Sequence, residues 1–334
     1  MTPFFILGVP RSGTTLLAEL LNGHSALFVP ERSHLGRLFM ARKMTLNHLQ
    51  RSGAYDFGAS WDEIDRLRLL GGLPARKGNE SILEQICSLL EQAANSEGKK
   101  YWGDKAPPFL DRMEEINLLF PGARFIHLIR DPRANAVSLR ERQSMEIELA
   151  MHWWVDLNVK GVQNGVHLGD SQYLRVRFED LLVEPQLVLQ RICGFLRVPY
   201  EHQMVSSLAH SKYTNRKGGY VEKELNHDKI NSWRKKVNPK IIARLERQAP
   251  RFISALGYDL DTHTEEATPL SGYRILWLSF KQNFRLLFNG RRKVMTGRVV
   301  EEVRIPFSRR LKKFFSQTAR LLFSDTFIKA WKKS

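Results

Sequence analysis

Short apolar runs alternate with helical patterns along the first 260 residues of the chain. Thr2–Val9 and Arg124–Ile129 have the composition of buried strands, and Tyr173–Phe178 alternates enough to lie near the edge of a sheet. The alternation of strands and helices predicts an α/β fold with a central, mainly parallel sheet flanked by helices. The predicted helices with an apolar face include Asn79–Asn95, Glu148–Val166, Leu187–Leu196 and Asn238–Leu256.

The last seventy residues have a different pattern. Tyr273–Phe288 and Pro306–Trp331 place apolar and aromatic residues along one helical face, with Lys and Arg between them. We therefore predict a catalytic domain over residues 1–262 and a basic amphipathic helical extension over residues 263–334. No apolar run in the sequence reaches the roughly 20 residues of a membrane-spanning helix.

The loop Gly8–Thr15 (GVPRSGTT) joins the first predicted strand to a helix. A strand, a loop bounded by glycines and a helix N-terminus form a cradle for an anion. The spacing is that of a P-loop, except that Thr14 stands in the position of the lysine. A nucleoside triphosphatase needs that lysine, so the loop favours a shorter 5′ group, held by backbone N–H groups, hydroxyls and Arg11.

Pro10–Leu17 (PRSGTTLL) resembles the 5′-phosphosulfate loop of the sulfotransferases that use 3′-phosphoadenosine 5′-phosphosulfate (PAPS). The arginine in this loop resembles the protein-tyrosine sulfotransferase and bacterial branch. A second segment, Arg130–Ser138 (RDPRANAVS), follows the strand Arg124–Ile129 and resembles the 3′-phosphate motif of the family. The resemblance implies a three-layer fold of the P-loop type, and it assigns Arg130 and Ser138 to the 3′-phosphate. The residues that it assigns to the 5′ end are Arg11, Ser12, Gly13, Thr14 and Thr15.

Two further segments supply candidate catalytic residues by the same resemblance. Tyr101–Pro107 (YWGDKAP) resembles the family's W-G-[DE]-K-[TS]-P stretch, whose lysine contacts the sulfuryl group or the bridging oxygen. Lys105 lies between the glycine before it and the two prolines after it, which suits a positioned catalytic group, and the alternative is a solvated lysine in a turn. Glu31 is the candidate general base for the acceptor hydroxyl, and His34 is the alternative base. The structural alternative is that Glu31 lies on the surface as an ion-pair partner of Arg32.

Two weaker matches lie later in the chain. Arg216, Lys217 and Gly218 resemble the R-K-G loop that closes over the 3′-phosphate in cytosolic sulfotransferases. Trp233 lies in a Ser-Trp-Arg segment, at the position where the bacterial branch has a [KR]-W-[RK] pair near the cofactor. Both segments are therefore included among the residues expected to bind PAPS.

These motifs predict transfer of the sulfuryl group of PAPS to an acceptor hydroxyl, giving a sulfate ester and 3′,5′-ADP. The reaction needs no metal, and the sequence offers no set of metal ligands. A P-loop kinase acting on a small hydroxylated substrate is the alternative enzyme, but Thr14 counts against it. The acceptor class stays open between a lipid, a glycolipid, a glycan and a secondary metabolite.

The net charge of +17 is concentrated in the extension. Residues 271–334 carry 16 Lys and Arg against three acidic residues, which leaves the rest of the chain near neutral. Basic amphipathic helices with aromatic faces favour an anionic membrane surface over nucleic acid. The alternative is that these faces dock on the catalytic domain or on a second subunit, and a homodimer is compatible with the sequence. No signal peptide precedes the first strand and only Cys87 and Cys193 occur, so we expect a cytoplasmic protein, peripheral on the inner face of the membrane.

Overall fold

The computed structural model describes residues 2–30, 82–105, 107–210, 225–262, 266–288, 291–296 and 299–304. The chain divides into two compact units. Unit 1 comprises residues 1–130 and 157–227, and unit 2 comprises residues 131–156 and 228–334. Helix α8 (Ile147–Leu168) begins in unit 2 and ends in unit 1. The expected domain boundary at residue 262 stays a prediction.

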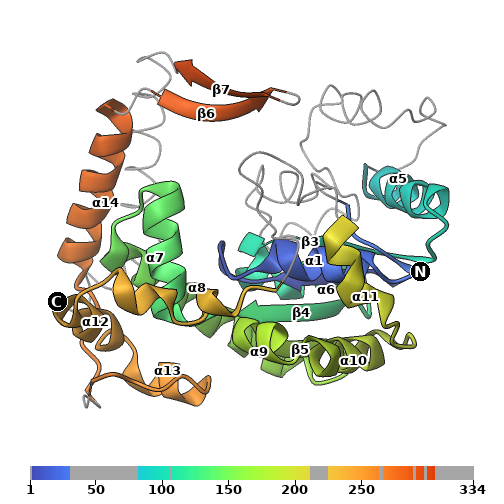
Figure 1. The fold of residues 1–334 in the computed structure, drawn as a ribbon, viewed down its shortest axis with the longest axis horizontal. Coiled ribbons are helices and arrows are strands. Elements are labelled where there is room, and N and C mark those ends of the chain that lie inside the picture. Colours follow the sequence, from blue (N-terminus) through green and yellow to red (C-terminus); the bar gives the residue numbers. More distant parts are fainter. Residues whose placement is uncertain are drawn as a thin grey trace. The chain divides into compact units, whose positions relative to one another are not determined.

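A five-stranded parallel sheet with the order β2-β3-β1-β4-β5 forms the centre of unit 1 (Figure 1). This sheet confirms the predicted α/β class, and β5 lies at an edge as its alternating pattern predicted. The strands are β1 (Phe4–Leu7), β2 (Leu27–Phe28), β3 (Tyr101–Lys105), β4 (Arg124–Ile129) and β5 (Tyr173–Arg177).

Aromatic side chains fill the core beside the central strand. Phe5 of β1 is fully buried, and its ring lies 5.6 Å from the rings of both Phe120 and Phe125. Trp102 of β3 meets Phe120 edge-on at 5.9 Å. Burial of one such side chain contributes about 2–3 kcal/mol, and this packing fixes the strands that end at the candidate site.

Helices of unit 1 contact the sheet along its length. Helix α1 contacts β1, β2 and β3, helices α9 and α10 contact β5, and α5 contacts β3. Pro185 begins α10 after α9 has ended, which is a position in a helix where proline is favoured. The helices are α1 (Thr14–Asn22), α5 (Ile82–Ser96), α6 (Met113–Leu119), α9 (Phe178–Val183), α10 (Pro185–Leu196) and α11 (Gln203–Ser206), with 3-10 turns η1 (Pro107–Asp111) and η2 (Ser207–His210).

Unit 2 has its own small core around Trp233. The buried side chains in this core are Ala134, Val137, Trp233, Val237 and Ile242. The prediction of one continuous helix over Asn238–Leu256 is wrong, because α12 ends at Glu246 and Pro250 begins a separate helix, α13. The elements are α7 (Pro132–Gln143), the first part of α8, η3 (His227–Lys229, starting at the last residue of unit 1), η4 (Ser232–Lys235), α12 (Pro239–Glu246), α13 (Pro250–Ala255) and α14 (Gly272–Phe288).

Helix α14 confirms the helix predicted over Tyr273–Phe288, and one of its faces is docked within unit 2. Leu278 is 3% exposed, and Arg274 forms an ion pair with Glu148 near the start of α8 at 3.2 Å. Beyond it, β6 (Arg291–Thr296) and β7 (Val299–Arg304) pair as an antiparallel hairpin, to which the sequence pattern assigned no structure. The helix predicted over Pro306–Trp331 lies outside the described residues. Among the helices that are described, none is both long and apolar enough to cross a membrane.

Candidate active site

The loop after β1 makes a sharp, partly left-handed turn into α1. The Ser12 N–H donates to the Val9 carbonyl at 3.0 Å, and Arg11 and Gly13 have positive φ angles of 76° and 96°. A positive φ costs a non-glycine residue about 1 kcal/mol or more. The turn is therefore held in a shape that an unconstrained chain would avoid, as is common where backbone must face a ligand.

The N-terminus of α1 carries no capping side chain. Gly13 occupies the cap position and has no side chain that could accept a hydrogen bond there, and the first turn contains no acidic residue. The first N–H groups of a helix have no partner within it, and the helix dipole adds positive potential at this end. The end of α1 beside Ser12, Thr14 and Thr15 can therefore bind an anion through backbone N–H groups and hydroxyls.

Phe178 explains why a glycine is required at position 13. A Cβ on Gly13 would lie 2.3 Å from Cδ2 of Phe178, which is closer than real Cβ atoms approach a neighbour. Phe178 is the first residue of α9, directly after β5, and it is 4% exposed. The ring of Phe178 thus packs against the loop at Gly13 and supports it. The sequence motifs did not assign this role. The sequence carries no signal for this contact, because it depends on the order of the strands in the sheet.

Arg130 connects this loop to the end of β4. Its Nη1 donates to the Arg11 carbonyl at 3.1 Å, and its guanidinium lies 4.8 Å from the centre of the Phe178 ring. Arg130 and Arg11, predicted from two motifs more than a hundred residues apart, are therefore brought together. The carboxyl ends of neighbouring parallel strands form the usual ligand-binding edge of such a sheet.

Lys105 lies at the carboxyl end of β3, beside the same helix. Its Nζ donates to Oγ1 of Thr15 at 3.4 Å. Residues 101–105 form a strand in which Lys105 pairs in register with Ile6 of β1, so the alternative of a lysine in a turn is wrong. The catalytic role of Lys105 stays a prediction. A strand beside β1 places the ammonium group near the N-terminus of α1 and gives it a better-defined position than a turn would.

His127 of β4 belongs to a group of three hydrogen-bonded polar side chains inside unit 1. Its Nδ1 lies 2.7 Å from the hydroxyl of Tyr173, and its Nε2 lies 2.9 Å from Oδ1 of Asn158. Burial lowers the pKa of His127 to about 3, although the hydrogen bond that its Nε2 donates to Asn158 opposes that shift. The imidazole is therefore neutral, with the Nε2 proton donated to Asn158 and the Tyr173 hydroxyl donating to Nδ1. This group fixes β4 and α8 and takes no part in proton transfer.

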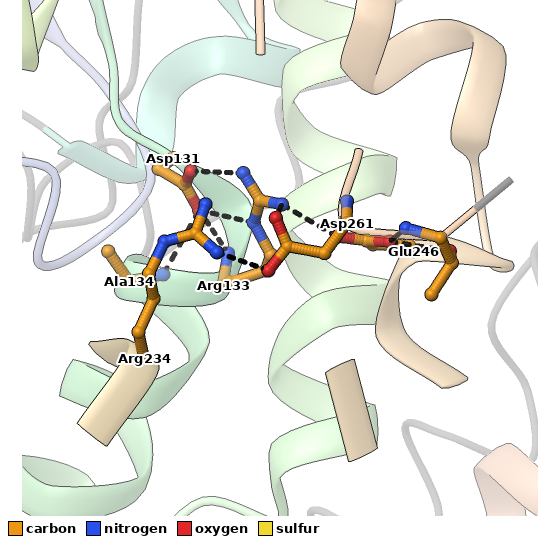
Figure 2. A network of polar contacts seen from close by, with 7 residues as sticks. Asp131, Arg133, Ala134, Arg234, Glu246 and Asp261 are labelled. Atoms are coloured by element: carbon orange, nitrogen blue, oxygen red, sulfur yellow. Dashed lines mark hydrogen bonds and ion pairs between the residues drawn. The ribbon is translucent and has the colours of Figure 1, made fainter. Parts of the chain in front are cut away.

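Unit 2 contains a second cluster of polar side chains, at the start of α7 (Figure 2). Asp131 caps α7 by accepting hydrogen bonds from the N–H groups of Arg133 and Ala134. Because this cap already fills the N-terminus of α7, any anion near it must be held by side chains. Ser138 lies further along α7 and is half-buried.

Trp233 is almost completely buried, at 1% exposed. The guanidinium of Arg133 lies 4.4 Å from its ring centre, and that of Arg234 lies 4.6 Å from it. The indole is thus in contact with two cations. Its expected role in binding PAPS stays a prediction.

Five of the predicted site residues lie outside the described part of the chain. They are Glu31, His34, Arg216, Lys217 and Gly218. Both candidate bases and the R-K-G segment therefore stay predictions.

Comparison with known proteins finds sulfotransferases. The Sulfotransferase family profile matches residues 3–202. Protein-tyrosine sulfotransferase A of Caenorhabditis elegans is 24% identical over 272 residues, which cover 77% of this chain and 68% of that protein. The protein-tyrosine sulfotransferase of Drosophila melanogaster is 25% identical over 279 residues; the match covers 78% of this chain but only 52% of the fly protein.

The fold is also similar to that of a solved sulfotransferase. The sulfotransferase domain from the curacin biosynthetic pathway superposes with a TM-score of 0.57 at 23% identity, covering 78% of this chain and 98% of that domain. The profile match extends over more than half of the chain and includes the loop, Lys105 and Arg130. The resemblance noted in the sequence is thereby confirmed: the chain belongs to the sulfotransferase family and is a transferase of that class.

Proposed function

We propose that this enzyme transfers the sulfuryl group of PAPS to an acceptor hydroxyl and releases 3′,5′-ADP. The observation that carries the proposal is the convergence of Lys105, Arg130 and the uncapped N-terminus of α1 at one edge of the sheet. Thr14 in place of the P-loop lysine favours this reaction over the transfer of a phosphoryl group from a triphosphate.

The loop would hold the 5′ end of the donor. Backbone N–H groups at the start of α1, the hydroxyls of Ser12, Thr14 and Thr15, and the Arg11 side chain would bind the phosphosulfate oxygens. Gly13 leaves the backbone uncovered at that point, and Phe178 keeps it in place. A rigid set of donors suits sulfuryl transfer, which depends mainly on positioning and charge stabilisation.

Lys105 would neutralise charge on the oxygen that leaves the sulfur. In the reaction, the acceptor oxygen forms a bond to sulfur while the bond from sulfur to the bridging oxygen breaks, and that oxygen departs with 3′,5′-ADP. The 3.4 Å contact of Lys105 with Thr15 supports this role, because Thr15 belongs to the first turn of α1. The acceptor proton would pass to Glu31 or to His34, and the sequence motif favours Glu31.

Arg130 and Ser138 would bind the 3′-phosphate, with Arg216, Lys217 and Gly218 added by the sequence motif. The contact of Arg130 with Phe178 supports a fixed guanidinium at the end of β4. Trp233, which is buried and packs with Ala134 and Val137 of α7, would serve this part of the site by supporting that helix.

The direct test is transfer of radiolabel from [³⁵S]PAPS to a panel of hydroxyl acceptors. The panel should contain a lipid extract, a glycan mixture, small phenols and tyrosine peptides, the last because the relatives are named protein-tyrosine sulfotransferases. We expect label in at least one class, with 3′,5′-ADP as the other product. Turnover of ATP with no label transferred from PAPS would favour the kinase alternative.

We further propose that α14 attaches the enzyme to an anionic membrane at its cytoplasmic face. Tyr273, Trp277 and Phe280 follow one another at helical spacing and are 69%, 51% and 46% exposed, on the side of α14 away from buried Leu278. Lys281 lies 5.1 Å from the centre of the Trp277 ring. With the surplus of Lys and Arg over residues 271–334, this exposed aromatic face has the composition of an interfacial helix. The attachment favours a lipid or glycolipid acceptor.

Vesicle flotation tests this attachment. The pair Tyr273→Ser and Trp277→Ser should reduce flotation with vesicles rich in phosphatidylserine by about tenfold. The pair Val166→Ser and Leu187→Ser, at exposed apolar positions outside α14, is the matched control and should float like the wild type. Equal flotation of both double variants would contradict the proposal, as would equal retention on neutral vesicles.

A further inference from the structure

Three segments of unit 2 meet at one buried carboxylate, that of Glu246 (Figure 2). Glu246 is the last residue of α12 and is 0% exposed. Its Oε1 accepts hydrogen bonds from Nη1 of Arg133 at 2.6 Å and from the N–H of Asp261 at 3.0 Å. Its Oε2 accepts from the N–H and the hydroxyl of Thr262, at 3.0 and 2.6 Å. Glu246 therefore joins α12 to the start of α7 and to residues 261–262.

Arg133 extends this linkage to Asp131 and to Trp233. Its Nε and Nη2 donate to the two carboxylate oxygens of Asp131 at 3.1 and 2.6 Å, while its flat face covers Trp233. Burial alone would lower the pKa of Arg133, but hydrogen bonds and charge from Asp131 and Glu246 raise it. The guanidinium is thus permanently charged. Arg234, which is paired with Asp261, also contacts the Trp233 ring.

A buried ionic cluster of this kind contributes little to stability compared with apolar side chains of similar volume. Its particular effect is geometric, because each hydrogen bond requires a defined position of its partner. The position that this cluster defines is the first turn of α7. Asp131 directly follows Arg130 in the sequence, and Ser138 lies on the same helix as Arg133.

We propose that Glu246 is a positioning residue for recognition of the donor's 3′-phosphate. Glu246 holds Arg133, Arg133 holds Asp131, and the start of α7 is thereby fixed for Ser138, the residue of this helix that the sequence motif assigns to that phosphate. Glu246 itself touches no substrate. The inference rests on the proposed function, and it adds to it a residue that none of the sequence motifs contains.

Calorimetric titration of the full chain with 3′,5′-ADP and with 5′-AMP tests this role, because the two ligands differ only in the 3′-phosphate. Glu246→Gln removes the negative charge at nearly constant volume. We expect its affinity for 3′,5′-ADP to fall by about tenfold or more, while its affinity for 5′-AMP changes by less than about twofold. A merely structural role would weaken both ligands alike.

Glu141→Gln is the matched control. Glu141 also lies on α7, but it forms a half-exposed ion pair with Lys236 at 3.0 Å, outside the cluster. This variant should bind both ligands like the wild type. Equal discrimination by Glu246→Gln and the wild type would overturn the inference alone, as would equal losses for both ligands. If the wild type itself binds both ligands equally, the proposed function fails and the inference fails with it.

Asp261→Asn keeps the test decisive if Glu246→Gln does not fold. The Asp261 side chain is 27% exposed and lies 3.7 Å from Nη1 of Arg133, so an amide there stays in contact with solvent. We expect a smaller loss of about threefold that is again confined to 3′,5′-ADP. A folded Asp261→Asn variant with wild-type affinity for 3′,5′-ADP would overturn the inference.

Discussion

The ring of Phe178 lies against the α-carbon of Gly13, so close that a Cβ at position 13 would be 2.3 Å from Cδ2 of the ring. The same ring lies beneath the guanidinium of Arg130, at 4.8 Å. One aromatic side chain therefore supports both the backbone of the loop and the cation that contacts it. This arrangement links the shape of the candidate anion site to the start of α9.

Gly13→Ala should disrupt the loop by two effects. The positive φ costs alanine about 1 kcal/mol, and the added methyl group must displace Phe178. We expect a lower melting temperature and a loss of affinity for 3′,5′-ADP of about a hundredfold. Calorimetric titration and thermal unfolding measure the two effects.

Gly169→Ala is the control that separates the cost of a positive φ from the effect of the clash with Phe178. Gly169 also has a positive φ, 74°, but a Cβ there would meet nothing within 4 Å. The control should lose only the backbone contribution and should bind 3′,5′-ADP like the wild type. Equal losses of affinity in the two variants would show that Phe178 does not shape the loop.

Lys105→Ala should lower kcat by about a hundredfold or more, because removal of one preorganised cation from a developing charge costs that much. The affinity for 3′,5′-ADP should change less than kcat. Lys100→Ala, an exposed residue just before the same strand, is the control and should keep wild-type turnover. Wild-type kcat in a folded Lys105→Ala variant would remove Lys105 from the reaction.

Arg11→Ala should also lower kcat by about a hundredfold or more.

His127 predicts a specific dependence of stability on pH. Its pKa in the folded protein is about 3, below the ordinary value of 6.5, so the unfolded chain binds the extra proton between these values. The stabilisation is complete above pH 6.5 and is lost as the pH falls toward 3, by about 1.4 kcal/mol per pH unit within that window. The free energy of unfolding in urea should fall between pH 7 and pH 5 by about 2 kcal/mol more for the wild type than for His127→Gln.

The control for that comparison is His167→Gln, because the His167 side chain is 72% exposed. It should retain the pH dependence of the wild type. If His127→Gln also retains it, the neutral buried imidazole inferred from the contacts with Asn158 and Tyr173 is contradicted.

Local patterns in the sequence predicted β1, β4, β5 and several of the helices, because each depends on neighbouring residues. The buried run Arg124–Ile129 became β4 at the same residues, and the loop before α1 was recognised from its glycines and hydroxyls. The strand Tyr101–Lys105 was not predicted, because glycine and aspartate weaken the strand signal of YWGDK, and only pairing with β1 makes it a strand. The break before Pro250 could have been predicted from the proline itself.

Contacts between distant segments could not be predicted in this way. Nothing around Phe178 in the sequence indicates that its ring would meet Gly13, because that contact depends on the order of strands in the sheet. Glu246 has the sequence environment of an ordinary surface glutamate at a helix end, yet its four hydrogen-bond donors come from residues 133, 261 and 262. Long-range packing determined both roles.

The central claim is that the loop after β1 and Arg130 bind one nucleotide that carries charge at its 5′ and 3′ ends. Competitive calorimetry on the wild type, with 3′,5′-ADP against ATP and Mg²⁺, tests it most directly. The account predicts that 3′,5′-ADP binds at least about a hundredfold more tightly, and that Arg130→Ala removes this preference. Tighter binding of ATP and Mg²⁺, or an undiminished preference in Arg130→Ala, would contradict it.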